Sequence, residues 1–301
     1  MSEVSQKIDP RGYLIKHLDA GERIQAHLLV IEEARRVKST FTDDTFPTIG
    51  PVDYPSIRTR LQKYAEFTSP LLELVAIGCF SGSKEMAVTW ADIIELISEY
   101  PQVLHQDVIN LRRLRAYPTL ILAYGGGVSA IAGGNYGTLA TILYRTWIAS
   151  ARTKEVKALA QSLYPEEIMD SQFVPHLFAE EPSPQDMHGH LQRVIRPALI
   201  DILPSDRKFT EAFDRFEAFL ALAYADLSYT GEDREVGWVP AGNFHRRRDD
   251  QVSVWERMKW EADTDEENWA PLQAGLFHGS VEYYRGLKGR VDQFLSRTGV
   301  W

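Results

Sequence analysis

The feature that most constrains the fold is an uncharged interval between Arg115 and Arg145, which holds six glycines between positions 125 and 137. An interval of this length without charge is either packed core or a membrane span. Glycine, tyrosine, asparagine and threonine interrupt it, whereas a span needs about 20 predominantly apolar residues. The interval therefore predicts a packed core, and we expect no association with a membrane.

The order of residues in this interval predicts a helical hairpin. Pro118 suits the first turn of a helix, where its missing N–H would have no partner. We therefore expect helices at 118–132 and 136–148. Residues 133–135, two glycines and an asparagine, tolerate positive φ and would form the tight turn between them. The small residues would let a neighbouring helix approach closely.

The same glycines also fit a nucleotide-binding turn. Gly125, Gly127 and Ala130 match G-x-G-x-x-A behind the strand-like TLILAY. However, the helix after them would break at Gly133, and no strand ending in an acidic residue follows about 20 positions later. Helix packing is the favoured interpretation, and a β-strand at 120–124 would contradict it.

A similar pattern occurs earlier in the chain. Pro70 and Pro118, 48 residues apart, each precede an apolar helix, a glycine-containing turn and a second apolar helix. Cys79 would be a core residue of the first unit. We therefore predict an all-α fold, an array of antiparallel helical hairpins with a loop-rich, tryptophan-rich C-terminal region.

The chain divides into three predicted parts. Residues 1–52 hold an N-terminal helix, at about 20–38, and a proline-rich linker. Residues 53–230 form the helical-hairpin domain, and 231–301 add a tryptophan-rich loop and helix that pack on the same domain. Ile24 and Leu28 would face inward from the N-terminal helix.

Composition narrows the classes of function. The 301-residue chain has a formal charge of −9, which argues against sequence-independent binding of nucleic acid. Its single cysteine excludes a disulfide framework and a cysteine-based zinc site. The polar start MSEVSQKIDP has no apolar core of a signal peptide, so a cytoplasmic location is expected.

Two acidic residues are candidate catalytic groups. Glu217 lies at the edge of the apolar stripe of a helix that begins after Ser205 or Asp206. A half-buried carboxylate with a raised pKa can act as a general acid or base, and Asp226 would join it. A structural ion pair between Glu217 and an arginine is the favoured alternative, which weighs against an enzyme.

His188 and His190, with Asp186, are candidate metal ligands, because imidazole and carboxylate together suit zinc, iron or manganese. Two histidines separated by one residue face the same side only in an extended segment. No third and fourth ligands can be identified. Histidines at the start of a helix are the favoured interpretation, and no cofactor is expected.

The C-terminal region holds candidate binding residues. Arg246, Arg247 and Arg248 would grip phosphate or an acidic partner surface, although charge runs are usually solvated. Trp238 and Trp255, with two further tryptophans nearby, indicate either a small satellite core or a contact surface.

Three segments carry a resemblance: YPTLILAYGGGVSAIAGGNYGTLATIL, FDRFEAFLALAYADL and WAPLQAGLFHGS. They resemble landmarks of an uncharacterised helical module that follows other domains in bacterial multidomain proteins, some of which resemble phage-defence or signalling proteins. The hairpin itself resembles a tetratricopeptide-type hairpin. The resemblance covers about 55–280 and implies no catalytic residue. It implies that any effector is supplied by another chain.

The sequence thus predicts a helical protein-interaction module, an adaptor, sensor or scaffold in a bacterial anti-phage defence system. Its partner would be a separately encoded effector or a second copy of the chain. The alternative is an enzyme acting on a nucleotide or nucleic acid through Glu217 and Asp226, or through His188 and His190. That alternative requires these side chains to converge on one pocket.

Overall fold

The computed structural model describes residues 9–50, 52–82, 84–99, 108–150, 153, 155–169, 174–182, 186–230, 235–244, 248–249 and 252–298. The first half contains helices α1 (Pro10–Asp19), α2 (Arg23–Thr40), α3 (Tyr54–Ser81), α4 (Ala87–Ser98), α5 (Ile109–Arg113), α6 (Tyr117–Ala132) and α7 (Tyr136–Ala140), with 3₁₀ turns η1 (Lys84–Met86) and η2 (Leu114–Ala116) and a π-helical turn η3 (Thr141–Arg145). The second half contains β1 (Trp147–Ala149), β2 (Val156–Ala158), α8 (Leu159–Ser162), α9 (Pro165–Ile168), α10 (Val174–Leu177), α11 (Met187–Leu199), α12 (Asp206–Ser228), β3 (Arg248–Asp249), β4 (Val252–Ser253), α13 (Val254–Asp265), η4 (Glu266–Asn268), α14 (Ala270–Gln273), η5 (Leu276–Gly279) and α15 (Val281–Arg297). The predicted predominantly helical fold is confirmed.

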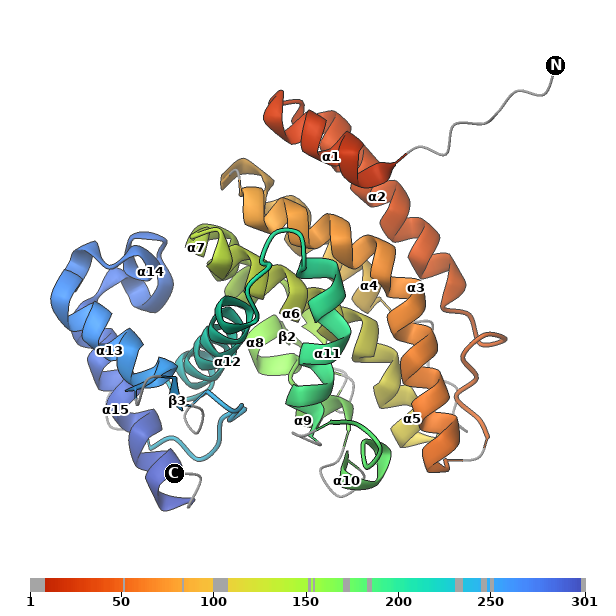
Figure 1. Ribbon diagram of the computed structural model, residues 1–301. Coiled ribbons are helices and arrows are strands. Elements are labelled where there is room, and N and C mark those ends of the chain that lie inside the picture. The colour runs from red at the N-terminus through yellow and green to blue at the C-terminus, as the bar shows by residue number, and fades with distance from the viewer. Residues whose placement is uncertain are drawn as a thin grey trace.

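Helix α6 occupies the centre of the molecule, between α3 and α12 (Figure 1). Its glycines face these two neighbours. A Cβ atom at Gly125 would overlap Leu72 of α3, and one at Gly127 would overlap the ring of Phe216 of α12. The glycines therefore serve helix packing, as predicted. The nucleotide-binding alternative is wrong, because its expected strand lies within a buried helix.

The predicted turn after α6 is confirmed, with Gly134 at φ 71°. The side-chain amide of Asn135 donates to the carbonyl oxygens of Phe80 at 2.5 Å and Cys79 at 3.1 Å, which fixes the turn against the end of α3. The second helix of the hairpin is shorter than predicted. It continues from α7 into the π-helical turn η3, and Ile148 lies in β1, paired with Lys157 of β2.

The predicted helix start at Pro70 is wrong. Pro70 lies inside α3, a single helix of 28 residues. Its ring is on the exposed side of the helix, where a long helix can bend and lose a hydrogen bond with the least disturbance to packing. Residues 70–97 therefore do not repeat the plan of the hairpin that begins with α6.

The N-terminal helices pack on α3 and α4 as an outer layer (Figure 1). Helix α1 was not predicted. Helix α2 buries Ala26, Val30, Ala34 and Val37. Ile24 and Leu28 are 72% and 58% exposed, so the predicted inner face is wrong. The alanines of the true inner face allow close packing between the helices.

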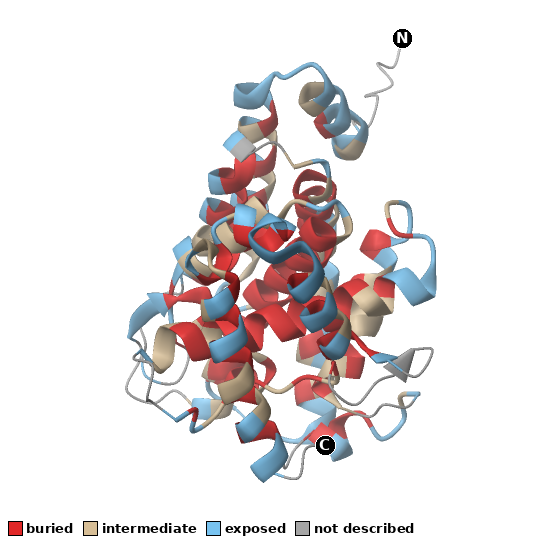
Figure 2. Ribbon diagram, turned by 90° about the vertical axis from the view of Figure 1, so that its left-hand side faces the viewer, coloured by how far each residue is buried: buried red, intermediate tan, exposed pale blue. Residues whose placement is uncertain are grey.

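At the other edge, α13 and α15 pack against α12 (Figure 1). Helix α12 is buried on all sides from Ala212 to Ala223, which makes it a second central helix. Figure 2 shows the buried residues gathered in the interior, with exposed residues around them. The buried side chains form one continuous cluster from Leu14 to Leu295. Within the described ranges, no helix is both long enough and apolar enough to cross a membrane.

Candidate functional site

Glu217 of α12 pairs with His188 at the start of α11, so the predicted arginine partner is wrong. One Glu217 carboxylate oxygen meets His188 Nδ1, and the other accepts the backbone N–H of Asn243 at 2.9 Å. Gly242 permits this approach, because a Cβ atom there would overlap the Glu217 carboxylate. Glu166 Oε1 lies 3.8 Å from His188 Nε2.

The neighbouring carboxylates determine the charge of His188. Burial alone lowers the pKa of the imidazole, but Glu217 and Glu166 outweigh burial and raise that pKa well above its ordinary value. Burial and the same carboxylates raise the pKa of the Tyr124 hydroxyl. The raised pKa therefore favours the protonated, imidazolium form of His188. Glu217 is 1% exposed, so a substrate cannot reach it, and the pair joins α11, α12 and the segment 235–244.

His190 belongs to a different cluster. Its Nε2 lies 2.8 Å from the Tyr117 hydroxyl, its Nδ1 lies 3.0 Å from Glu181, and its ring stacks on Phe178. Residues two apart on a helix point to different sides. His188 and His190 therefore do not share a cation. In the part of the chain that the structure describes, no group of three His, Cys, Asp or Glu side chains is placed to hold a metal.

Asp226 forms a third cluster. It accepts hydrogen bonds from the Tyr144 hydroxyl at 2.9 Å and the Tyr283 hydroxyl at 2.6 Å. His278 Nε2 lies 3.5 Å from Asp226 Oδ1. Asp226 follows Glu217 by nine residues on α12, roughly 13 Å along the helix axis. The two predicted catalytic carboxylates therefore do not act on one reacting group.

The backbone around Asp226 is unusual in two places. Tyr144 lies in the π-helical turn η3. This conformation is rare in proteins as a whole, but where it occurs it is often at a functional site. Phe277 and His278 adopt φ of 52° and 57°, and Glu266 is the one other non-glycine residue with positive φ among those described. Such positions cost on the order of 1–3 kcal/mol each. Nothing in the sequence around GLFHGS marked this strain.

The predicted binding residues of the C-terminal region have different positions. Trp255 is fully buried, and its indole N–H donates to Asp292 at 2.5 Å, so it is a core residue rather than a contact surface. Trp238 is half-buried against tyrosine rings of α12 and the loop before α9. Arg246 and Arg247 lie outside the described residues, and of Arg248 only the backbone, in β3, is described.

One surface was missed by the sequence analysis. Ile24 and Leu28 of α2, and Val88 of α4, are 72%, 58% and 58% exposed. The two helices are joined beside them by His27 Nδ1 and Thr89 Oγ1, 3.2 Å apart. We call Ile24, Leu28 and Val88 the α2–α4 apolar face.

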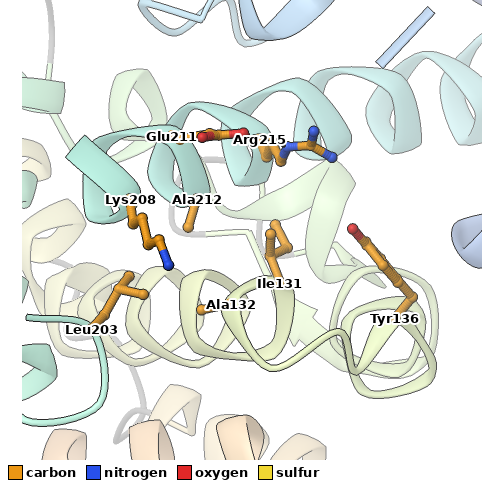
Figure 3. Close-up of a pocket in the computed structure, with 8 residues that line it drawn as sticks. All are labelled: Ile131, Ala132, Tyr136, Leu203, Lys208, Glu211, Ala212 and Arg215. Carbon is orange, nitrogen blue, oxygen red and sulfur yellow. Dashed lines mark ion pairs between the residues drawn. The ribbon is translucent and has the colours of Figure 1, made fainter. Parts of the chain in front are cut away.

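A cavity of about 260 Å³ lies between the end of α6 and the first half of α12 (Figure 3). Its lining is Ile131, Ala132, Tyr136, Leu203, Lys208, Glu211, Ala212 and Arg215. Arg215 is already paired, because its guanidinium donates to Glu261 at 2.9 Å. The cavity is smaller than the roughly 300–1,000 Å³ of typical ligand pockets, and its arginine is engaged by protein.

The chain matches no protein-family model, no curated protein and no solved structure. The roles of its residues therefore rest on their geometry.

Proposed function

We propose that the protein is a helical protein-interaction module, an adaptor or scaffold, whose partner packs on the α2–α4 apolar face. The observation that carries the proposal is the exposure of Ile24, Leu28 and Val88 on two helices that pack side by side. Large aliphatic side chains gathered on one exposed face are typical of an interaction surface.

The face has the composition of an interface centre with a polar rim. Burying one Val, Leu or Ile side chain gives about 1.5–3 kcal/mol, so these three residues would supply much of the binding energy. Arg23 and Glu85 form an exposed ion pair beside them, 3.6 Å apart. Charged pairs at a rim contribute to specificity more than to affinity.

The spacing of the face suggests the form of its partner. Ile24 and Leu28 are one helical turn apart on α2. Val88 of α4 precedes Thr89, whose hydroxyl lies 3.2 Å from His27 of α2. An amphipathic helix with an apolar stripe fits beside Ile24 and Leu28. The resemblance of three segments of this chain to a helical module of bacterial multidomain proteins, some of which resemble phage-defence proteins, supports a separately encoded effector as the partner.

The proposal is tested by site-specific cross-linking. A photo-reactive amino acid at position 24 or 28, expressed in the source organism at native level, should cross-link to a single partner protein. The same probe at Glu282, an exposed polar residue of α15, is the matched control. The double variant Ile24→Glu and Leu28→Glu should abolish the complex and leave the melting temperature within a few degrees of the wild type.

Three outcomes contradict the proposal: no cross-linked species from either position, equal capture from position 282, or a complex that persists in the double variant. Cross-links between two copies of this chain, with a dimer in light scattering that the double variant dissociates, would instead make the face a self-association surface and overturn the effector as partner.

A further inference from the structure

We propose that a second cavity, between the first turns of α3 and the loop that follows α2, binds a small phosphate monoester. The cavity has a volume of about 370 Å³, within the roughly 300–1,000 Å³ of typical ligand pockets. It is lined by Thr45, Phe46, Pro47, Pro55, Ser56, Thr59, Arg60 and Lys63. It lies beyond the C-terminal end of α2, whereas Ile24 and Leu28 are near the N-terminal end of that helix (Figure 1). The proposal therefore goes beyond the interaction function and concerns a different site.

The two cations that line the cavity are not neutralised by the protein. Within the described ranges neither Arg60 nor Lys63 makes an ion pair, and the cavity lining contains no carboxylate. Asp43, in the loop after α2, pairs with Arg115 instead. Like charges three residues apart on a helix repel each other, and an anion beside them would relieve the repulsion. In a chain with a formal charge of −9, this unpaired basic pair marks a local site for an anion.

The protein holds the Arg60 guanidinium in place and leaves part of its hydrogen-bonding capacity unused. Its Nη2 donates to the Pro47 carbonyl oxygen at 2.5 Å, and its Cζ lies 6.0 Å from the centre of the Phe46 ring. The Tyr64 hydroxyl also faces it, but burial raises the pKa of that hydroxyl to about 12, so Tyr64 is no counter-ion. The Arg60 Nη1 is buried without a hydrogen-bond partner among the described residues. An anion in the cavity would supply the acceptor that this donor lacks.

The polar part of the lining favours a phosphate over other anions. Arg60 and Lys63 carry two positive charges, which match the dianion of a phosphate monoester. Ser56 and Thr59, each four residues before one of these cations, add exposed hydroxyl donors on the same side of α3. A phosphate has three outer oxygens to accept such bonds, whereas a carboxylate has two. The N-terminus of α3 itself is already capped, because Asp53 accepts the N–H of Ser56 at 2.7 Å.

The apolar part of the lining indicates an organic group on the phosphate. Pro47 and Pro55 are exposed and come from two different segments of the chain. A proline ring has no N–H to donate, so these walls gain more from an apolar group than from water. We therefore expect a monoester with a compact apolar group to bind more tightly than inorganic phosphate.

Isothermal titration calorimetry of the whole protein with phenyl phosphate tests the site. We expect saturable binding to one site with a dissociation constant below about 1 mM. Phenol, which lacks the phosphate, should show no binding under the same conditions. Inorganic phosphate, which lacks the ring, should bind about tenfold more weakly.

Two variants connect the binding to the cavity. Arg60→Gln and Lys63→Gln should each weaken the binding of phenyl phosphate by about tenfold or more, because each removes a charge-assisted hydrogen bond. Lys63 is exposed, so its variant should keep the fold, and thermal unfolding checks this. Lys259→Gln is the matched control, since it removes the same charge from an exposed position of α13. It should leave the affinity unchanged.

The proposal is overturned if phenyl phosphate shows no saturable binding up to about 10 mM, or if phenol or inorganic phosphate binds as tightly. It is also overturned if Lys259→Gln weakens binding as much as Lys63→Gln, which would indicate a general attraction of anions. A peptide with one phosphoserine is titrated as well. If it binds more than about tenfold more tightly than phenyl phosphate, a small-molecule ligand is contradicted. Cross-linking at position 24 reports independently on the interaction function.

Discussion

At the scale of single residues, the pairing of His188 with Glu217 places two ionisable side chains in contact inside the protein. Two charged groups in a dry environment lose their hydration, and the pair is stable only when each group keeps its partners. The Asn243 backbone N–H and the missing side chain of Gly242 provide this for Glu217. The contact therefore fixes how the segment 235–244 meets α12.

The stability of the protein should depend on pH through His188. The folded state holds this proton above the ordinary histidine pKa of about 6.5, where the unfolded chain releases it. The free energy of unfolding should therefore fall as pH rises above about 6.5, by up to about 1.4 kcal/mol per pH unit, until pH passes the folded-state pKa. Below about pH 6.5 the stabilisation is fully present.

Urea unfolding between about pH 6 and 9 measures this dependence. Glu217→Gln should flatten the curve, because the carboxylate that raises the pKa is gone. Glu22→Gln is the control, since it removes an exposed carboxylate, 2.6 Å from the half-buried His17, whose pairing at the surface should matter little. Parallel curves for the wild type and Glu217→Gln would contradict the role of Glu217 in raising the pKa of His188.

The sequence indicated that Glu217 is half-buried at the edge of the apolar stripe, whereas it is 1% exposed, and it did not indicate the partner of Glu217. Its position on the apolar stripe of α12 follows from helical periodicity. Its partner is 29 residues away, on another helix, and depends on how α11 crosses α12. Periodicity orients a side chain on its own helix and says nothing of crossing angles, so an arginine was as reasonable an expectation as a histidine.

At the scale of elements, the glycines of α6 set the distance between helices. Gly127→Ala should destabilise the protein by about 1–3 kcal/mol, because the new methyl group would overlap the Phe216 ring and force α12 outward. Gly137→Ala in α7 is the matched control. A Cβ atom there meets nothing within 4 Å, so the change should stabilise by about 0.4–1 kcal/mol.

Thermal and urea unfolding of the two variants measure the difference between them. If Gly127→Ala were as stable as Gly137→Ala, the packing of α6 against α12 would be looser than described. Gly127 would then have no role in setting the distance between the two helices.

Elements were predictable where one local signal was strong. The turn after α6 follows from glycines and asparagine, and α12 from its regular apolar spacing. The single helix α3 was not predictable, because Pro70 is a helix breaker whose cost is offset by tertiary packing against α6. The π-helical turn η3 carries no local signal and depends on the contacts of Tyr144.

At the scale of the whole molecule, the inner face of α2 shows why surfaces were harder to predict than the core. Larger side chains are expected inward, yet Ile24 and Leu28 face outward, and two alanines and two valines face inward. The side of α2 that is covered is decided by how α2 lies on α3 and α4, and the residues of α2 alone do not specify that arrangement.

Cys79 reports on the integrity of the central packing. Its side chain is fully buried, in α3, and a Cβ atom at Gly126 of α6 would lie 3.3 Å from its sulfur. Burial raises the pKa of the thiol, which suppresses the reactive thiolate. Because one continuous buried cluster extends from α1 to α15, we expect a thiol reagent to reach Cys79 only when this core opens.

Labelling with a disulfide reagent should therefore be slowed at least about a thousandfold in native buffer relative to the unfolded chain. In urea, the labelled fraction and the loss of helical circular dichroism should share one midpoint. Labelling at concentrations of urea where the helical signal is intact would show that α3 and α6 separate before the rest unfolds. The variant Cys79→Ser has no thiol, so its labelling under native conditions measures the background. Rapid labelling of the wild type in buffer without urea would mean that α3 and α6 separate without global unfolding.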